Sequence, residues 1–204
     1  MQQVEGTPGT PVRRGRGRRP ADEVRADILT AAGALLLREG MAAFTIERVA
    51  QEAGVSKTTI HKWWPSRGTL ALDGYFHAVE STLAFPDTGD IAADLTAQVR
   101  AFVRLLTGTP AGPVIGGLIG RAQTDPDLLA ALLERYSGPR RELAVAAMRR
   151  AQDRGQLRAD ADPEILVDQL WGACYHRLLL PDQPLTDAFA GRLVANLLHG
   201  VGTG

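Results

Sequence analysis

The chain has 204 residues, of which 45% are hydrophobic and 23% are charged, a composition typical of a globular protein with one large or two small domains. No stretch approaches 18 consecutive apolar residues, and the N-terminus lacks the apolar segment of a signal peptide, so we expect no contact with a membrane. Cys174 is the single cysteine, so an internal disulfide is excluded. No metal-ligand spacing is present, and we expect neither metal nor cofactor and a cytoplasmic location.

The formal net charge of zero conceals an asymmetry along the chain. Residues 1–68 carry 11 Lys and Arg against 7 Asp and Glu, a net charge of +4, whereas residues 69–204 carry 12 against 16, a net charge of −4. The two lysines of the chain, Lys57 and Lys62, lie close together in the positive part. This pattern predicts a local contact with a polyanion in the N-terminal third.

The first elements in chain order are an arm and an amphipathic helix. Residues 1–19 are rich in Arg, Gly and Pro and have little to bury, which predicts a flexible arm. Apolar residues then recur at three- and four-residue spacing over 21–38, the period of a helix, and Gly40 follows where a terminating glycine is expected.

Three further helices are predicted by their N-cap residues, and the rest of the chain continues as helix after helix. Thr45, Ser56 and Ser66 are suited to cap these three helices, and Pro65 ends the second of them. A kink is expected at Gly138-Pro139. No segment alternates like a β-strand, so we predict an all-α fold of about nine helices. The expected helices after the first cover 46–53, 56–64, 66–84, 90–106, 114–123, 126–153, 163–180 and 185–198.

Residues 45–64 predict two short helices that flank a tight turn at Gly54, a residue that tolerates a left-handed backbone. An apolar seam would hold the two helices at a fixed angle: Ile46, Val49, Ala50, Val55 and Ile60. The side chains left facing outward are Lys57, Thr58, Thr59, His61 and Lys62. Cations, hydroxyls and an imidazole suit phosphate oxygens and base edges in a DNA major groove. The alternative is an exposed helix of an ordinary bundle, which seldom carries such residues without an acid.

This stretch resembles the DNA-binding head of the tetracycline-repressor (TetR) family over residues 22–75. The resemblance is carried by Ile28, Ala31, Ala32, Thr45, Val49-Ala50, Ala53-Gly54-Val55-Ser56, Thr59-Ile60, Trp63-Trp64-Pro65-Ser66-Arg67 and Leu70. The sequence departs from the family at Thr58, where glycine is frequent, at His61, where tyrosine is usual, and at Trp63-Trp64, where Tyr/His-Phe is usual. The operator sequence therefore cannot be transferred from relatives.

The resemblance, together with the chemistry of the side chains, implies a set of phosphate contacts. Thr45 and Ser56 would present a hydroxyl and backbone N–H groups to phosphates. Arg67 resembles the basic phosphate clamp of the family, and His61 and Lys62 are expected to contact phosphate as well.

Base-edge contacts are expected from the start of the second short helix, at Lys57, Thr58 and Thr59. Trp64 is expected in the core, and Trp63 either against the DNA backbone or in the core. In the arm, Arg16, Arg18 and Arg19 would either enter an adjacent minor groove or only add non-specific attraction. The implied organisation is an arm at 1–19, a helix-turn-helix domain at 20–68 and a dimerisation and ligand-binding domain at 69–204.

Two heads of this kind pair across a two-fold axis to read half-sites about 34–36 Å apart. The last two predicted helices are more apolar than peripheral helices need to be, which favours a homodimer interface there, although a plain hydrophobic core is the alternative. The candidate interface residues are Leu166, Leu170, Ala173, Phe189, Leu193 and Leu197.

A pocket for a small, largely apolar effector is expected among the helices of the body, although any one of these residues is more often ordinary core. His176 is notable because an imidazole in an apolar segment needs a partner. Cys174 is expected to be a buried thiol rather than a redox sensor. The candidate pocket residues are Phe102, Leu106, Leu118, Ile119, Gln123, Tyr136, Trp171, Tyr175 and His176.

These observations together predict a one-component transcriptional regulator, a repressor that binds a palindromic double-stranded DNA operator as a dimer and is released by an effector. The alternatives are a DNA-binding or architectural protein without a ligand, and an activator of the same fold. An all-α enzyme is disfavoured because the four histidines, His61, His77, His176 and His199, are scattered without a motif.

Overall fold

A computed structural model describes residues 19–200 of the chain. It is built from α-helices and two short helical turns of other types, and the stretch from Arg19 to Gly200 contains no strand. This stretch holds nine helical segments when two groups of adjacent elements are each counted once: α4 with η1, and α7 with η2 and α8. This confirms the all-α prediction. The elements are α1 (Ala21–Ala43), α2 (Ile46–Ala53), α3 (Lys57–His61), α4 (Arg67–Val79), the 3-10 turn η1 (Glu80–Leu83), α5 (Ile91–Gly108), α6 (Ala111–Ala122), α7 (Pro126–Leu132), the π-helical turn η2 (Leu133–Ser137), α8 (Gly138–Asp153), α9 (Pro163–Leu179) and α10 (Asp187–His199).

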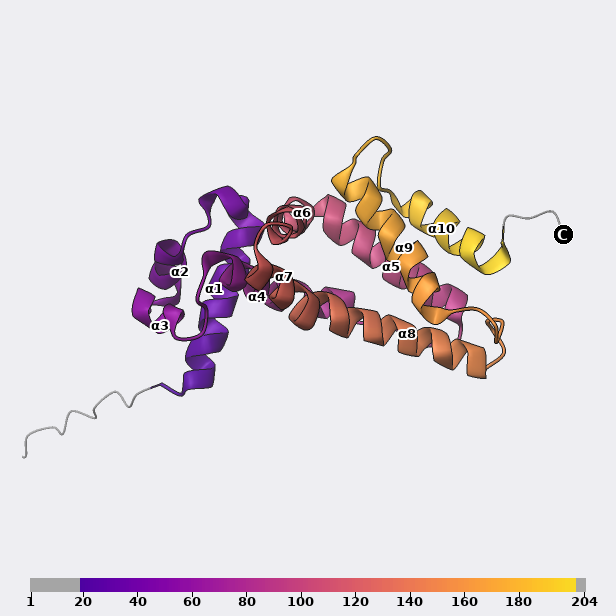
Figure 1. Cartoon of the computed structure of the whole chain (residues 1–204), viewed down its shortest axis with the longest axis horizontal. Helices are drawn as coiled ribbons and strands as arrows, with labels where there is room; N and C mark the ends of the chain where they lie inside the picture. The colour runs from indigo at the N-terminus through magenta and orange to yellow at the C-terminus, as the bar shows by residue number, and fades with distance from the viewer. Residues whose placement is uncertain (1–18, 201–204) are drawn as a thin grey trace, which may run out of the picture.

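The molecule is elongated, with the short helices at one end (Figure 1). We call α1, α2 and α3 the head, and α5 to α10 the body. Helix α4 joins the two, because it packs against α1 and also against α6 and α7. A single hydrophobic core, which includes Ile28 of α1, Leu72 of α4 and Leu118 of α6, runs through this junction. Movements of the body can therefore reach the head through α4.

The predicted N-caps of the head are confirmed. The backbone N–H of Arg48 donates to the Thr45 hydroxyl (3.2 Å), and that of Thr59 donates to the Ser56 hydroxyl (3.1 Å). Ser66 caps α4 in the same way, with the Thr69 N–H at 3.2 Å. Each bond satisfies a backbone donor that the first turn of a helix leaves without a partner.

The turn between α2 and α3 depends on Gly54, whose φ of 65° lies in the left-handed region. Helix α3 is shorter than the predicted range of 56–64, since it ends at His61 and continues as a turn. Pro65 prevents the helix from continuing beyond this turn, because it has no N–H and disfavours a helical backbone at Trp64.

Two other predicted boundaries differ from the structure. The first helix is interrupted at Gly40 (φ 74°), as expected, but helical turns resume and α1 reaches Ala43. The predicted loop over 108–113 is too long, because α6 already begins at Ala111. Pro113 does not prevent this, since the first-turn N–H groups of a helix have no intrahelical acceptor.

The predicted kink at Gly138-Pro139 takes the form of the π-helical turn η2. The Gly138 N–H donates to the carbonyl of Leu133, five residues earlier, instead of four. Pro139 has no N–H, and its ring clashes with the carbonyl four residues earlier in a regular α-helix. The wider π turn relieves this clash, so α7, η2 and α8 form one continuous helical run instead of a broken one.

Helices α1 and α4 cross at unusually close range at a pair of glycines. A Cβ atom on Gly33 would lie 2.6 Å from the Gly74 carbonyl oxygen, and a Cβ on Gly74 would lie 2.6 Å from the Ala32 Cβ. Only residues without a side chain permit this approach, which fixes the angle between the head and α4.

No single helix of the described part is long and apolar enough to cross a membrane, although α5 and α6 meet the length and composition test together as a pair bent by 90°.

Candidate nucleic-acid interface and ligand cavity

The α2–turn–α3 unit has the rigid base that a recognition helix needs. Val49 and Ile60 are fully buried and Ala50 is nearly so, while Ile46 and Val55 pack half-buried against the same core. The predicted apolar seam is therefore confirmed. Because these side chains come from both helices and the intervening turn, α3 is held at a fixed angle to α2.

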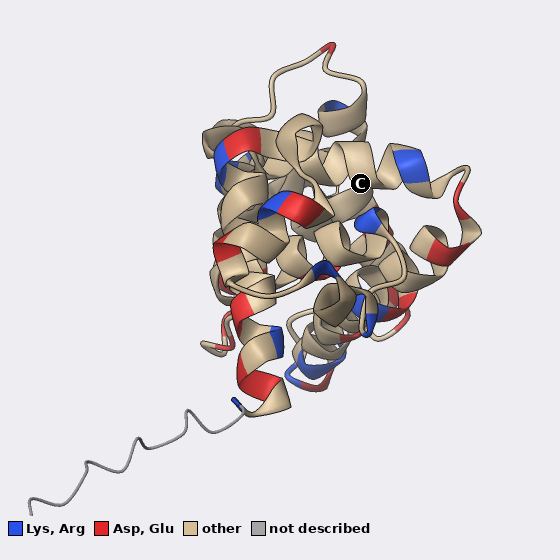
Figure 2. Cartoon of the chain, turned by 90° about the vertical axis from the view of Figure 1, so that its left-hand side faces the viewer, with Lys and Arg blue, Asp and Glu red and all other residues tan. Residues whose placement is uncertain are grey.

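The polar residues of α3 lie on the outside of the head. Lys57, Thr58, His61 and Lys62 are exposed, and Arg67 is exposed at the first position of α4, where its guanidinium donates to the Phe44 carbonyl (3.4 Å). In the view onto the head, Lys and Arg positions along the ribbon alternate with Asp and Glu positions (Figure 2). The surface is thus a mixed one, in which Arg25 and Arg38 lie on α1 and Arg48 lies on α2, while Lys57 and Lys62 lie at the two ends of α3.

Three of the predicted contact residues hold structural roles as well. Thr45 and Ser56 are occupied as N-caps, and the hydroxyls of Ser56 and Thr59 lie 2.9 Å apart. Thr59 is only half-exposed, in contrast to its neighbour Thr58. Thr58 therefore presents the freer hydroxyl for a base edge.

Lys57 has a carboxylate partner within the head. Its ammonium group lies 3.0 Å from Glu47 of α2, and both side chains are more than half exposed. The hydrogen bond from Lys57 lowers the pKa of Glu47 below its usual value. Exposed pairs of this kind contribute little to stability, so Lys57 can exchange Glu47 for another acceptor at small cost.

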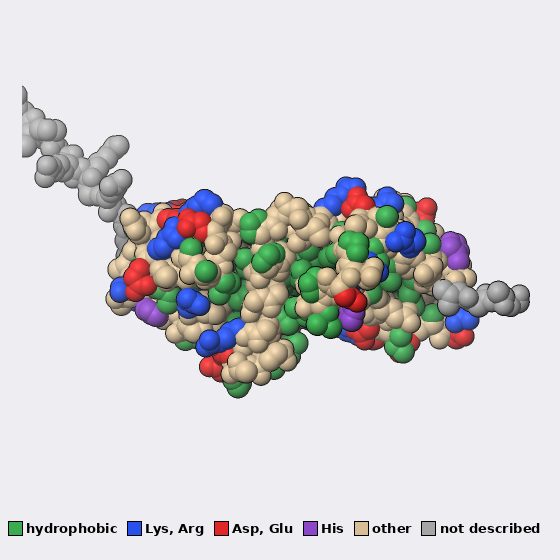
Figure 3. All heavy atoms as spheres, turned by 90° about the horizontal axis from the view of Figure 1, so that it is seen from above, with side chains coloured by type: hydrophobic (Ala, Val, Ile, Leu, Met, Phe, Trp, Pro, Cys, Tyr) green, Lys and Arg blue, Asp and Glu red, His purple; other side chains and the backbone are tan. Residues whose placement is uncertain are grey.

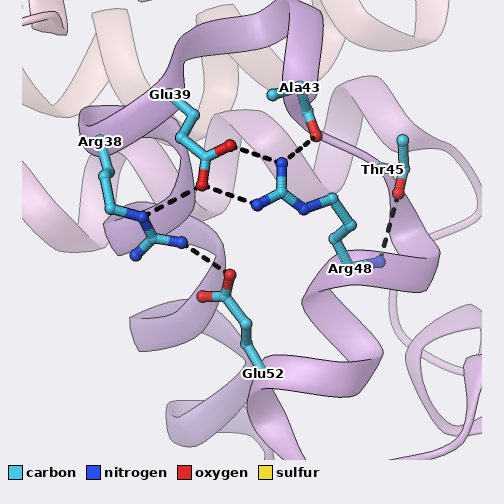
Figure 4. A network of polar contacts seen from close by, with 6 residues as sticks. All are labelled: Arg38, Glu39, Ala43, Thr45, Arg48 and Glu52. Carbon is cyan, nitrogen blue, oxygen red and sulfur yellow. Dashed lines mark hydrogen bonds and ion pairs between the residues drawn. The ribbon is translucent and has the colours of Figure 1, made fainter.

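A network of charged side chains ties α2 to the end of α1 (Figure 4). The Arg48 guanidinium makes two hydrogen bonds to the Glu39 carboxylate, each 2.6 Å long, and a third to the Ala43 carbonyl at 3.2 Å. Arg38 donates to Glu39 (3.1 Å) and to Glu52 (2.7 Å). The Arg48 side chain therefore turns back onto α1.

These arginines lower the pKa of Glu39 from its usual 4.5 to about 2, mainly through the hydrogen bonds from Arg48. Because the pKa of Glu39 is lowered in the folded state, the contribution of the Arg48–Glu39 pair to stability is present above pH 4.5 and is lost as the pH falls towards 2.

We expect Arg48→Met to return the titration midpoint of Glu39 towards 4.5, measured by carbon NMR of the side-chain carboxylates. Arg38→Met, the control, removes a lesser contact and should shift the midpoint less. A wild-type midpoint near 4.5 would contradict the assignment.

A second polar cluster links Trp64, three residues after the end of α3, to the body. Trp64 is fully buried, as predicted, and its indole N–H donates to the Asp73 carboxylate of α4 at 2.8 Å. The guanidinium of Arg135, in η2 of the body, also contacts Asp73 (3.1 Å), and Arg25 of α1 lies 3.9 Å from it. Trp63, whose position was left open, is half-buried with its ring edge-on to Trp64.

The body contains a cavity of about 240 Å³ between α5, α8 and α9. Four of the predicted pocket residues line it: Phe102, Tyr136, Trp171 and Tyr175. The other five do not. Leu106 and Leu118 are buried in the core and Ile119 is half-buried, whereas Gln123 and His176 are exposed. His176 therefore does not need the polar partner that a buried imidazole would require.

Sequence reasoning missed several residues of the cavity wall, above all the two arginines Arg140 and Arg141. Arg141 pairs with Glu164 (2.6 Å) and with Asp168, which also lines the cavity. A usable signal was present, since Arg140 follows Tyr136 by four residues and so shares its helix face. The other wall residues missed are Phe85, Gln98, Ser137, Leu143, Ala144, Val167, Asp168 and Gly172.

The predicted dimer residues lie on α9 and α10, and five of the six are half-exposed: Leu166, Ala173, Phe189, Leu193 and Leu197. Leu170 is different, because it is fully buried in the core of its own chain and has no surface left for a partner.

Cys174 is also fully buried, and burial raises the pKa of its thiol to about 12. It therefore remains a protonated thiol, as expected for an inert core cysteine.

The arm is only partly within the described range. Arg19 is exposed and forms an ion pair with Asp27 of α1. Arg16 and Arg18 lie outside the described residues.

Comparisons with known proteins agree with this architecture. Residues 28–73 match the family model of bacterial regulatory proteins, tetR family, and residues 85–197 match the tetracyclin repressor-like C-terminal domain. The uncharacterized HTH-type transcriptional regulator YdeS of Bacillus subtilis is 35% identical over 90% of this chain and 92% of its own. The DNA-binding transcriptional repressor TetR of Mycobacteroides abscessus is 32% identical over 85% and 90% of the two chains.

The crystal structure of the TetR family transcription regulator SCO0332 is similar along the whole fold. It has a TM-score of 0.84 and 62% sequence identity, and covers 88% of this chain and 99% of that one. The head geometry, the two family models and these relatives lead to one conclusion: the chain belongs to the TetR family of helix-turn-helix transcriptional regulators.

Proposed function

We propose that this regulator is a repressor that binds a palindromic DNA operator as a homodimer in the cytoplasm and leaves it when a small effector enters the body. The observation that carries the DNA-binding part is α3 and its C-cap Lys62, where the exposed Lys57, Thr58, His61 and Lys62 stand on a buried apolar base. In this scheme residues 20–68 bind DNA, and residues 69–204 pair and sense the effector.

The proposed division of contacts follows the position of each side chain. Lys57 and Thr58, at the start of α3, would reach base edges in the major groove, with the half-exposed Thr59 beside them. His61, Lys62 and Arg67 would contact phosphates on either side. The capping groups at Thr45 and Ser56 would approach the backbone of the same half-site, and a minor-groove role for Arg16, Arg18 and Arg19 stays a prediction.

Two alanine substitutions test this division. Lys57→Ala is expected to cost about 1–3 kcal/mol at one base position of each half-site and to relax specificity there. Arg67→Ala should weaken all sequences together and reduce the slope of log affinity against log salt by about 1. Fluorescence anisotropy with operator variants at several salt concentrations measures both. Equal effects from the two substitutions would show that the division is wrong.

Selection of bound DNA from a random pool tests the function itself. A palindrome with half-site centres about one helical turn apart, 34–36 Å, is expected if two heads bind together. The absence of any sequence preference would overturn the proposal.

The proposed pairing surface is formed by α9 and α10. Phe189, Leu193 and Leu197 are half-exposed along α10, and Ile165 and Leu179 of α9 are about half exposed. Hydrophobic side chains gather over the middle of the face shown in Figure 3, between more highly charged ends. A four-helix interface between two copies would cover such side chains.

Release from DNA would follow from a shift between two states of the dimer that differ in the distance between its two heads. The cavity residue Tyr136 is adjacent in η2 to Arg135, which contacts Asp73. Asp73 in turn accepts a hydrogen bond from Trp64, three residues after the end of α3. An effector that displaces Tyr136 would thereby act on the base of the recognition helix. It can do so only by its differential affinity for the two spacings, typically about 1–3 kcal/mol. The cavity favours this scheme over a ligand-independent DNA-binding protein.

A further inference from the structure

The wall of the cavity carries one positive charge that no carboxylate balances. Its charged residues are Arg140, Arg141 and Asp168. Arg141 is paired with Asp168 and also with Glu164. Arg140, in contrast, makes no ion pair with any residue between Arg19 and Gly200, and its Nε is buried without a hydrogen-bond partner there. A partly buried guanidinium without an acceptor is costly to maintain.

The surroundings of Arg140 are aromatic. Its Cζ lies 5.2 Å from the centre of the Phe76 ring and 5.0 Å from that of Tyr136. These ring faces attract the cation, but they offer no oxygen that could accept its N–H groups. The guanidinium is therefore held in place on two rings, with hydrogen-bond donors left over.

The remaining cavity wall favours a flat apolar group. Phe85 and Trp171 form one ring pair, with centres 6.3 Å apart, and Phe102 meets Tyr175 edge-on at 5.5 Å. The volume of about 240 Å³ exceeds the roughly 150 Å³ of a cavity that accepts a benzene ring. The cavity admits a ligand of one ring or two fused rings, which its aromatic walls would bind through stacked and edge-to-face contacts.

We infer that the effector is an aromatic monocarboxylate, with its carboxylate on Arg140 and its ring system between the aromatic side chains of α5 and α9. This inference rests on the proposed effector site. It also refines the expectation of a largely apolar ligand, because it adds one anionic group to an apolar ring system. The carboxylate would accept the guanidinium hydrogen bonds that the chain itself leaves unmade.

The test compares 2-naphthoate with its neutral amide, 2-naphthamide, by calorimetry on the full-length protein. The carboxylate is expected to bind at least about tenfold more tightly, as hydrogen bonds between charged groups allow. Arg140→Gln should reduce this ratio to about one while the amide keeps its affinity, which also reports that the variant is folded. Arg140→Lys, which retains the cation, should keep part of the preference. The matched control is Arg149→Gln, an exposed arginine on the same helix, which should leave the ratio unchanged.

Several outcomes would overturn the inference: no binding of 2-naphthoate at millimolar concentration, equal affinity for acid and amide, or a preference that survives Arg140→Gln. Tighter binding of octanoate than of 2-naphthoate would show that the ligand is not aromatic.

Operator binding is measured in parallel by anisotropy. If 2-naphthoate binds through Arg140 but leaves operator affinity unchanged, the ligand class stands and release by effector fails. If Arg135→Met binds 2-naphthoate normally but no longer releases DNA, the contact with Asp73 transmits the signal.

Discussion

Replacement of Trp64 by alanine is expected to lower the free energy of unfolding by roughly 3–5 kcal/mol, the range for loss of a fully buried large aromatic side chain. Trp64 has no exposed surface, and it contacts Arg25 of α1 and Asp73 of α4. Its indole N–H is also the closest hydrogen-bond donor to Asp73, which is only 9% exposed. The substitution therefore creates a cavity and removes a partner from a buried carboxylate at the same time.

The adjacent Trp63 provides the control. Trp63 is half-buried and packs edge-on against Trp64, so Trp63→Ala should cost clearly less than Trp64→Ala. Trp64→Phe keeps most of the ring but loses the N–H, and is expected to cost about 1–3 kcal/mol. Urea unfolding followed by circular dichroism measures all three. A larger loss of unfolding free energy for Trp63→Ala than for Trp64→Ala would contradict the assignment of Trp64 to the core and of Trp63 to a half-buried position.

Gly33→Ala is expected to destabilise the protein by about 1–3 kcal/mol, as overpacking does in a close-packed core. The added methyl group would lie 2.6 Å from the Gly74 carbonyl oxygen and 2.8 Å from the Ala78 Cβ. A backbone oxygen cannot rotate away, so α1 and α4 must separate. Operator affinity should fall as well, because this crossing sets the position of the head on α4.

Gly120→Ala is the matched control. Gly120 is exposed on α6, and nothing lies within 4 Å of the position its Cβ would take. Alanine is the better helix former by about 1 kcal/mol, so this substitution should stabilise the protein and leave operator binding unchanged. Thermal unfolding and anisotropy measure both properties. Stabilisation by Gly33→Ala would show that the helices do not cross as closely as the glycine pair implies.

The head could be predicted well from the sequence because its signals are local. Thr45, Ser56 and Ser66 cap helices a few residues away, and Gly54 needs only its own backbone conformation. The path of Arg48 could not be predicted in the same way. Its partner Glu39 belongs to the preceding helix, and their contact depends on how α1 and α2 pack.

The cavity was predicted only in part, because helices distant in sequence assemble it. The apolar content of the segments indicated candidate residues but not which face of each helix turns inward. Tyr136 and Trp171 line the cavity, whereas Leu118 faces the core at the junction. Arg140 escaped notice because arginine is normally a surface residue. Its spacing of four residues from Tyr136 places both on one helix face, but only the packing of α8 against α9 turns that face towards the cavity.

Lys57 is held by Glu47 before any DNA arrives. The carboxylate acts as an internal competitor, because Lys57 must leave it to reach a base, and it repels nearby phosphates. Because the pair is exposed, the exchange itself costs little, so the larger effect of Glu47 in the proposed complex is its repulsion of phosphates close to α2. That repulsion depends on where the DNA backbone passes, and it disfavours any docking of the head that brings a phosphate against Glu47.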